Sequence, residues 1–282
     1  MVPVDLTMRR LHVYALFVVV LAMGVMIAGA TITSTEVAAR ESQSAVTLIP
    51  SDGLHRSLGI TLVLLTLGLA IWTSLGAIPR WIRIVAWTGV VALVSDSALA
   101  WQALPLSPMT GVLHALLAHL YLSLSVVVAV GTSWSWNREP ELVDGSIRPL
   151  LRPLAIAIPP VVFLQITLGA AYRHDMTSVM PHMAVAMGVA FLALIGSSVI
   201  LQNFPRPASM RKAAIALISI VLTQVCLGIT AFLLLVLNAT GASYFMLATV
   251  GHVAVGAATL AASVVMAMQV WRSVLPKLKA PS

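Results

Sequence analysis

Eight long apolar runs occupy most of the 282-residue sequence, and short polar or Pro/Gly-containing segments separate them. A helix needs roughly 20 predominantly apolar residues to cross a hydrocarbon core of about 30 Å, so each run is long enough to span a membrane. Hydrophobic residues make up 60% of the chain and charged residues 9%, against roughly 25% charged in soluble domains. A water-soluble fold is therefore excluded, and the sequence predicts an all-α, polytopic membrane protein. The expected spans are 11–33, 56–77, 82–104, 110–133, 153–172, 180–202, 213–237 and 244–270.

The basic residues give the chain a formal charge of +7, yet they lie in short clusters between the apolar runs and form no continuous stripe. They therefore indicate membrane topology and not nucleic-acid binding. With eight spans, thirteen Lys and Arg residues fall on the side of both termini and three on the opposite side. Positive charge is enriched on the cytoplasmic side of membrane proteins. We therefore expect a multi-pass protein of the cell (inner) membrane with both termini in the cytoplasm.

The longest and most polar connection on the cytoplasmic side follows the fourth span and divides the chain into two sets of four spans. We expect two pseudo-repeated four-helix bundles, residues 1–142 and residues 143–282, in parallel orientation because each begins on the same side. A local trace of duplication is the motif Q-x-x-L-G, which occurs at residues 165–169 and again at residues 224–228.

Four of the seven histidines open the even-numbered spans, a few residues in from the outer surface. They are His55, His114, His182 and His252. Even spans all run in the same direction, so these imidazoles share one level of the membrane. A polar group within hydrocarbon costs several kcal/mol unless it is satisfied, and a metal is the simplest partner. Imidazole is the usual axial ligand of haem iron, and two helices can clamp a porphyrin between them. The sequence thus predicts one haem-sized site per half, built by the first two and the last two of these histidines.

The alternative interpretation of each histidine is an interfacial residue that is hydrogen-bonded to water or to a carbonyl. Four histidines at one level favour the metal, whereas the interfacial interpretation is the default for His12, His119 and His174. His119 lies five residues after His114, and both can face the bundle interior. The residues alone leave the choice between these two open.

Charged residues accompany the histidines. Asp52 stands three residues before His55 and is a candidate general base, substrate-orienting group or partner of the imidazole, although its spacing favours a helix N-cap. Arg56 can donate to a haem propionate or extend to the membrane interface. Asp96 lies inside the third span, where an unpaired carboxylate is costly. We expect it to be protonated or paired across helices.

Taken in order along the chain, these residues resemble the haem A synthase family of membrane proteins. In the first half the resemblance rests on a glycine-rich end of the first span (24–29), on D-G-L-H-R at residues 52–56, which is similar to the family's E-x-x-H-R, and on the proline six residues before His114. In the second half it rests on Q-x-x-L-G-x-x-x-R-H at residues 165–174 and on the histidines that open the sixth and eighth spans. The resemblance covers nearly the whole chain.

The resemblance implies oxidation of the C8 methyl group of haem O to the formyl group of haem A, which terminal oxidases use. It implies a substrate haem in the N-terminal half and a permanent haem b in the C-terminal half, and it favours His114 over His119 as a ligand. The residues implied are Asp52, His55 and His114 for catalysis, His182, His252, Arg56 and Arg173 for cofactor binding, and the four histidines of the even spans as iron ligands.

The partners implied are the farnesyl transferase that makes haem O and an external electron donor, since no flavin or dinucleotide motif is visible. Membrane lipid surrounds the chain, and a homo-oligomer is compatible with the sequence.

The chain differs from the family in two places. Many members carry a cysteine pair in an outer loop, whereas residues 34–50 contain no cysteine and the single Cys226 lies in an apolar run. Asp52 replaces the family's glutamate, which shortens its reach by about one methylene.

Two other functions use the same features. A non-enzymatic di-haem b-type electron carrier would employ the four histidines with both haems permanent. A transporter or haem-handling chaperone would employ the paired halves.

Overall fold

The computed structural model describes residues 6–42, 51–101, 107–240 and 243–275. These residues fold into eight α-helices and one 3-10 turn, and no β-strand occurs among them. Every one of the eight helices is long and apolar enough to cross a membrane, which confirms the predicted all-α, polytopic membrane fold. The helices are α1 Leu6–Ser42, α2 Ser51–Leu75, α3 Arg80–Ala100, α4 Pro108–Thr132, α5 Leu151–Arg173, α6 Val179–Asn203, α7 Ala208–Val236 and α8 Ser243–Ser273.

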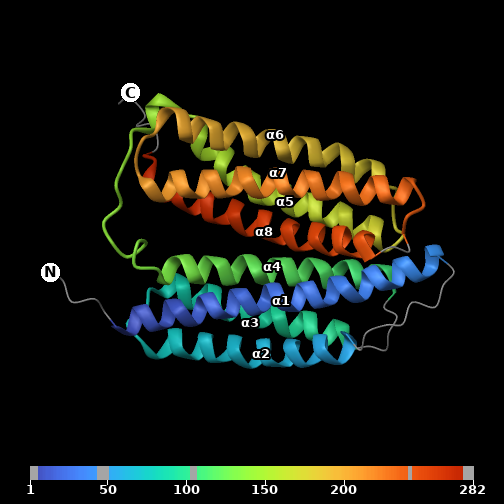
Figure 1. The fold of residues 1–282 in the computed structure, drawn as a ribbon. Helices are drawn as coiled ribbons and strands as arrows, with labels where there is room; N and C mark the ends of the chain where they lie inside the picture. The colour runs from blue at the N-terminus through green and yellow to red at the C-terminus, as the bar shows by residue number, and fades with distance from the viewer. Residues whose placement is uncertain (1–5, 43–50, 102–106, 241–242, 276–282) are drawn as a thin grey trace.

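Each predicted span corresponds to one helix, but the boundaries differ at some ends. The first span was expected to end near residue 33, whereas α1 continues to Ser42 and extends beyond its neighbours (Figure 1). Apolar length measures the part of a helix that lipid covers, and a helix can continue past it when its residues favour helix. Conversely, α3 ends at Ala100, four residues before the expected boundary.

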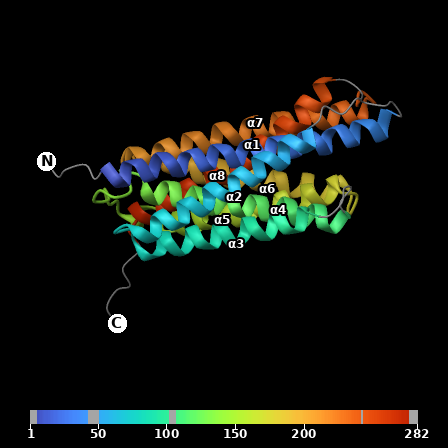
Figure 2. The same ribbon diagram turned by 90° about the horizontal axis from the view of Figure 1, so that it is seen from below.

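The helices form two bundles that lie side by side, α1–α4 below and α5–α8 above in Figure 1. Within the first bundle, α1 and α3 each pack on both α2 and α4; within the second, α5 and α7 each pack on both α6 and α8. The histidine-bearing even helices therefore lie on the diagonals. The bundles meet where α8 packs on α1 and α4, and where α4 packs on α5. Figure 2 shows the same arrangement from below.

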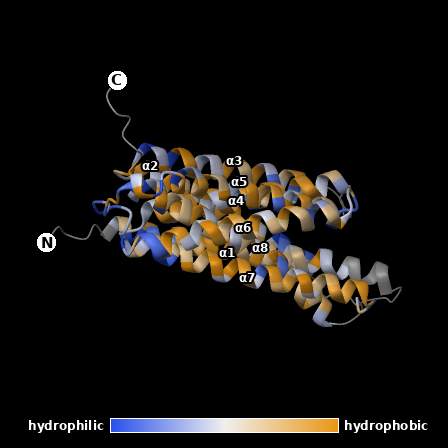
Figure 3. Cartoon of the chain, turned by 90° about the horizontal axis from the view of Figure 1, so that it is seen from above, coloured by the Kyte–Doolittle hydropathy of each residue, from blue (hydrophilic) through white to orange (hydrophobic). Residues whose placement is uncertain are grey.

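Two clusters of buried apolar side chains follow this division. The first is built by α1–α4 together with Ala257 of α8, and the second by α5–α8. Large apolar side chains such as Val20, Leu64, Met187 and Leu247 are instead exposed on the outside of the bundles. Figure 3 shows hydrophobic colour along the helices and hydrophilic colour gathered toward their ends. This distribution is typical of helices whose outer faces contact lipid.

The connection between α4 and α5 is tied to the end of α8. Val143 donates to the Ser273 carbonyl (2.9 Å) and accepts from the Leu275 N–H (3.0 Å). Next to it, Asp144 accepts from the backbone N–H and the hydroxyl of Ser146, and these bonds lower the pKa of the Asp144 carboxyl. The ordered connection fixes the two bundles to one another at the end where α1 begins and α8 ends.

Candidate functional site

Two histidines face each other in the first bundle. His55 lies about one turn into α2, and His114 lies in the second turn of α4. Their ring centroids are 6.2 Å apart and their ring planes are inclined by 86°. Both side chains are half-buried, so protein atoms do not fully cover the ring edges. Because α2 and α4 are the diagonal helices, the pair crosses the middle of the bundle.

The second bundle repeats this arrangement. His182 in the first turn of α6 and His252 in α8 have ring centroids 6.1 Å apart and planes inclined by 82°. Both rings are again half-buried. The structure therefore brings the four predicted histidines together as the two predicted pairs, one in each bundle.

The spacing matches that of two axial ligands on one metal ion. An imidazole nitrogen lies about 2.0–2.1 Å from a bound metal and roughly 1.1 Å from its own ring centre, so ligands on opposite sides place their ring centres roughly 6.3 Å apart. Two rings in edge-to-face contact can have a similar spacing, about 4.5–7 Å. The hydrogen-bond partners of the ring nitrogens are what distinguish the two arrangements.

All four histidines direct Nδ1 at an acceptor on the preceding helix. The Nδ1 partners are the Val25 carbonyl for His55 (3.0 Å), the Asp96 carboxylate for His114 (2.7 Å), the Gln165 carbonyl for His182 (3.1 Å) and the Gln224 carbonyl for His252 (3.2 Å). A carbonyl can only accept, so these contacts favour a proton on Nδ1 and a free lone pair on Nε2 in His55 and His252. At His182 the side-chain nitrogen of Gln165, a donor, also lies 2.9 Å from Nδ1. Metal-binding histidines are held in this way, with one nitrogen fixed by an acceptor and the other free to coordinate.

The three backbone carbonyls that face a histidine occur in the same local pattern, with a glycine one helical turn later. In each case a glycine follows four residues after the residue whose carbonyl accepts, and the imidazole lies against that glycine. A Cβ added at Gly29, Gly169 or Gly228 would come within 3.0, 2.8 and 2.8 Å of Cε1 of His55, His182 and His252. Real Cβ atoms essentially never approach closer than 3.0 Å, so the second-bundle rings need glycine at these positions. Sequence reasoning had treated these glycines only as parts of motifs.

At His114 the acceptor is a side chain, the carboxylate of Asp96, and not a backbone carbonyl as at the other three histidines. This carboxylate is buried in α3, and Oδ1 lies 2.7 Å from Nδ1 of His114. The contact is at ion-pair distance but off the angle of a regular hydrogen bond, and neither atom has another partner. Asp96 therefore lies next to a candidate partner on another helix, His114, as one of the two expectations for it requires. A single acidic residue within a span was the signal, but the partner could not be read from it.

A cavity of about 20 Å³ adjoins this contact, with Asp96, Tyr121 and Val25 in its wall. A space of about 10–15 Å³ holds one water molecule. Tyr121 is itself buried and hydrogen-bonded to Thr66. The first bundle therefore has polar groups directly beside its histidine pair.

The glutamines of the two Q-x-x-L-G motifs border the second pair. The side-chain nitrogen of Gln165 lies 3.3 Å from Nε2 of His182, and that of Gln224 lies 3.4 Å from Nε2 of His252. Both contacts exceed an ordinary N–H hydrogen bond of about 2.9–3.0 Å. The amide oxygens of both glutamines are buried and have no hydrogen-bond partner. The second pair thus has two unsatisfied acceptors beside it.

Asp52 and Arg56 form an ion pair at the start of α2. Nε of Arg56 lies 3.1 Å from Oδ2 of Asp52, and both side chains are about half exposed, at 43% and 48%. Since α2 begins at Ser51, Asp52 lies inside the first turn and not at the N-cap position that its spacing suggested. Both residues are one turn or less from His55, at the outer end of the first pair.

Arg173, expected to bind cofactor, contacts α1. Its Nε donates to Thr33 (2.9 Å), and its terminal nitrogen donates to the Ala30 carbonyl (3.0 Å) and to Ser34 (2.5 Å). Thr249 of α8 donates to the same Ser34 hydroxyl (3.1 Å). The guanidinium thereby joins the second bundle to the first at their outer ends.

The other three histidines have different surroundings. His119 is buried, and its Nδ1 contacts the Ala115 carbonyl of its own helix (2.6 Å). His12 contacts the Ala129 carbonyl (2.9 Å), and the ring of His174 lies against Gly111 of α4. Of the two candidates in α4, His114 is therefore the one that faces His55.

The fold and the site define this chain as a polytopic helical membrane protein with one pair of facing histidines in each of two four-helix bundles. No protein-family model matches the chain, and no curated protein is significantly similar to it. Within the described ranges there is no group of three or more His, Cys, Asp or Glu side chains placed to hold a metal ion. Haem iron needs no such group, because the porphyrin supplies four ligands and the protein only the axial ones.

Proposed function

We propose that this protein binds two haem groups, one between His55 and His114 and one between His182 and His252. The observation that carries the proposal is the axial spacing of both pairs together with Nδ1 anchored on the preceding helix. The unpartnered glutamine oxygens and the glycines that leave room for the rings support it. Neutral nitrogen donors at this spacing suit haem iron.

We further propose the activity that the resemblance implies, conversion of the C8 methyl of haem O to the formyl of haem A. The haem groups would supply the redox chemistry, and the protein would supply axial ligands, orientation and a dry surrounding. Two successive hydroxylations give a geminal diol that loses water. Each hydroxylation takes one oxygen atom from O₂, releases the other as water, and consumes two electrons and two protons from an external donor.

The two bundles would divide this work. The first bundle would hold the substrate, because Asp96 and the Asp52–Arg56 pair place two carboxyl groups beside its histidines. Asp52 would hold or move a proton beside the substrate in place of the family's glutamate, and Arg56 would offer a charged donor to a carboxylate. The second bundle, whose histidines are anchored by backbone carbonyls, would hold the permanent haem b.

The surroundings of the protein follow from the same proposal. We place it in the cell membrane with both termini in the cytoplasm, since thirteen of its sixteen basic residues fall on that side. Its partners would be the haem O-forming farnesyl transferase, an electron donor, and a further copy of itself if it oligomerises.

The test is a pigment analysis of cells that express the protein beside a source of haem O. Formyl porphyrin in the extract of wild-type cells, and its loss in His55→Ala, is the expected outcome. Absence of formyl porphyrin from protein that contains both haems would reject the activity and leave the binding sites. Protein without haem absorption would reject both proposals.

A second function is favoured by one observation, the near identity of the two pairs, at 6.2 and 6.1 Å. Two iron atoms that each have two protein ligands have no open position, which is typical of electron carriers. Under this function both haems remain bound as haem b through purification, and no haem A is made.

A further inference from the structure

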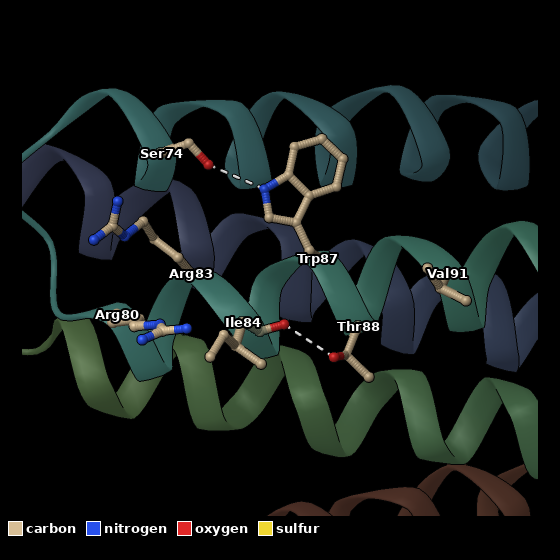
Figure 4. A pocket seen from close by; sticks show the side chains of 7 residues that line it. All are labelled: Ser74, Arg80, Arg83, Ile84, Trp87, Thr88 and Val91. Atoms are coloured by element: carbon tan, nitrogen blue, oxygen red, sulfur yellow. Dashed lines mark hydrogen bonds between the residues drawn. The ribbon is translucent and has the colours of Figure 1, made fainter.

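A groove of about 620 Å³ lies on α2 and α3 (Figure 4). His55 lies near the start of α2, whereas the groove lies near its end, so the groove is far from the histidine pair along the helix. It lies toward the end of the bundle where α2 ends and α3 begins. Figure 4 shows Arg80 and Arg83 at one end of the groove and Val91 at the other. The haem proposal makes no use of this surface.

The basic end of the groove has donors without acceptors. Neither the guanidinium of Arg80 nor that of Arg83 makes a hydrogen bond or an ion pair within the described part of the chain, and Nε of Arg83 is buried without a partner. No acidic side chain lines the groove. A buried guanidinium nitrogen without an acceptor is costly, so the site calls for an anionic oxygen ligand. Arginine is suited to phosphate, which it can bind through two parallel hydrogen bonds.

The remainder of the groove is apolar and firmly built. The indole N–H of Trp87 donates to the Ser74 hydroxyl (3.0 Å), which holds the ring across the α2–α3 interface (Figure 4). Ile84 and Val91 continue the same face and are 55% and 65% exposed. Tryptophan is enriched where the membrane meets water, and exposed aliphatic side chains on a spanning helix contact acyl chains. The groove thus has a basic end next to an apolar stretch, which matches the phosphate headgroup and the acyl chain of a phospholipid.

We propose that this groove binds one anionic phospholipid of the surrounding membrane. The phosphate lies between the guanidinium groups of Arg80 and Arg83, and an acyl chain runs over Trp87 and Val91. Basic pockets of this kind near the end of spanning helices attract anionic lipid. A free phosphate ion would satisfy the arginines but would leave the apolar part of the groove without a ligand. The lipid is therefore favoured over the ion.

The test is native mass spectrometry of the full chain, purified in detergent and mixed with phosphatidylglycerol or with phosphatidylcholine. Wild type is expected to retain one phosphatidylglycerol and to prefer it over phosphatidylcholine. The double variant Arg80→Gln/Arg83→Gln should bind it roughly 30-fold more weakly, since each arginine near an anionic surface contributes about fivefold to sixfold. Arg206→Gln removes an exposed charge from the connection between α6 and α7 of the other bundle and should bind like wild type.

Two further arms make the result decisive. Millimolar inorganic phosphate should not displace the lipid; displacement would mean that the site binds the free ion. Arg83→Lys keeps the charge but removes Nε, and an intermediate loss is expected for a ligand seated on the guanidinium. Equal binding of both lipids, or equal retention in the double variant and wild type when both remain folded by circular dichroism, would overturn the proposal. If the double variant does not fold, Arg83→Lys decides the question alone.

Discussion

Nδ1 of His114 and Oδ1 of Asp96 lie 2.7 Å apart, and neither atom has any other hydrogen-bond partner. The three other paired histidines face backbone carbonyls instead. A carboxylate that accepts from a ligand imidazole makes the imidazole a stronger donor to the metal than a carbonyl does. The two bundles therefore have similar histidine pairs, but only the His114 ring faces a carboxylate instead of a backbone carbonyl.

If the first bundle binds haem as proposed, replacing Asp96 by Asn should raise the reduction potential of that haem, because a neutral amide supports the electron-rich imidazole less well than a carboxylate. The second haem should keep its potential. Losses of such partners typically cost roughly 10–100-fold in metal affinity or activity. An optical redox titration of the purified protein resolves the two haems.

The control for this variant is Asp144→Asn, the same chemical change in the connection between the bundles. It should leave both potentials unaltered. Two unchanged potentials in Asp96→Asn would mean that the contact has no influence on the iron.

Histidine replacements test the pairing itself. His114→Ala should abolish the haem of the first bundle and leave the second, so the haem content per protein should fall by about half because an axial ligand is lost. His252→Ala should do the reverse. The pyridine haemochrome content of purified variants measures both.

His119→Gln is the matched control in α4. This ring contacts its own helix and not His55, so the variant should retain both haems. If His119→Gln lost the first haem and His114→Ala kept it, the assignment within α4 would be reversed.

The glycines beside the imidazoles give a test that leaves every ligand in place. Gly169→Ala puts a methyl group 2.8 Å from Cε1 of His182, closer than Cβ atoms approach a neighbour. The ring must move, so we expect a weakened or spectrally altered second haem and a loss of about 1–3 kcal/mol in stability from overpacking. Absorption spectra and thermal unfolding in detergent measure the two effects.

Gly188→Ala in α6 is the control, because a Cβ there meets nothing within 4 Å. It should keep both spectra and gain roughly 0.5–1 kcal/mol, as alanine does over glycine inside a helix. Similar spectra in both alanine variants would show that the rings tolerate displacement.

The sequence predicted the parts of this structure that depend on local composition and on the direction in which each helix crosses the membrane. Apolar length predicted eight helices, and the direction of the even helices put four histidines at one level. The partner of Asp96 could not be predicted, because it depends on how α3 is rotated about its axis relative to α4. The same holds for Arg173, whose motif pointed to cofactor but whose guanidinium contacts α1. Contacts across helices are set by packing that periodicity in one helix does not encode.

Arg173→Ala should destabilise the outer ends of the bundles, because it removes donors to Thr33, to Ser34 and to the Ala30 carbonyl. Hydrogen bonds that involve a charged group contribute about 1.5–3 kcal/mol each, so the loss should be at least that of one bond. Thermal unfolding in detergent should register it while the haem content at low temperature stays that of wild type. Loss of the second haem with unchanged unfolding temperature would instead support the role in cofactor binding that the motif suggested.

Replacing Asp52 tests its proposed catalytic role separately from its contribution to folding. Its ion pair with Arg56 is half exposed, and such pairs contribute about 0–1 kcal/mol, so Asp52→Asn should fold and load haem like wild type. If Asp52 moves a proton during methyl oxidation, the rate should fall by roughly 10²–10⁴-fold, the usual contribution of a positioned acid or base. Asp52→Glu keeps the carboxylate and extends it by one methylene, so it should retain activity. Formyl porphyrin formed per haem-loaded protein measures all three. Equal rates in wild type and Asp52→Asn would mean that the carboxylate only holds Arg56, and Arg56→Gln would then be expected to show the larger defect.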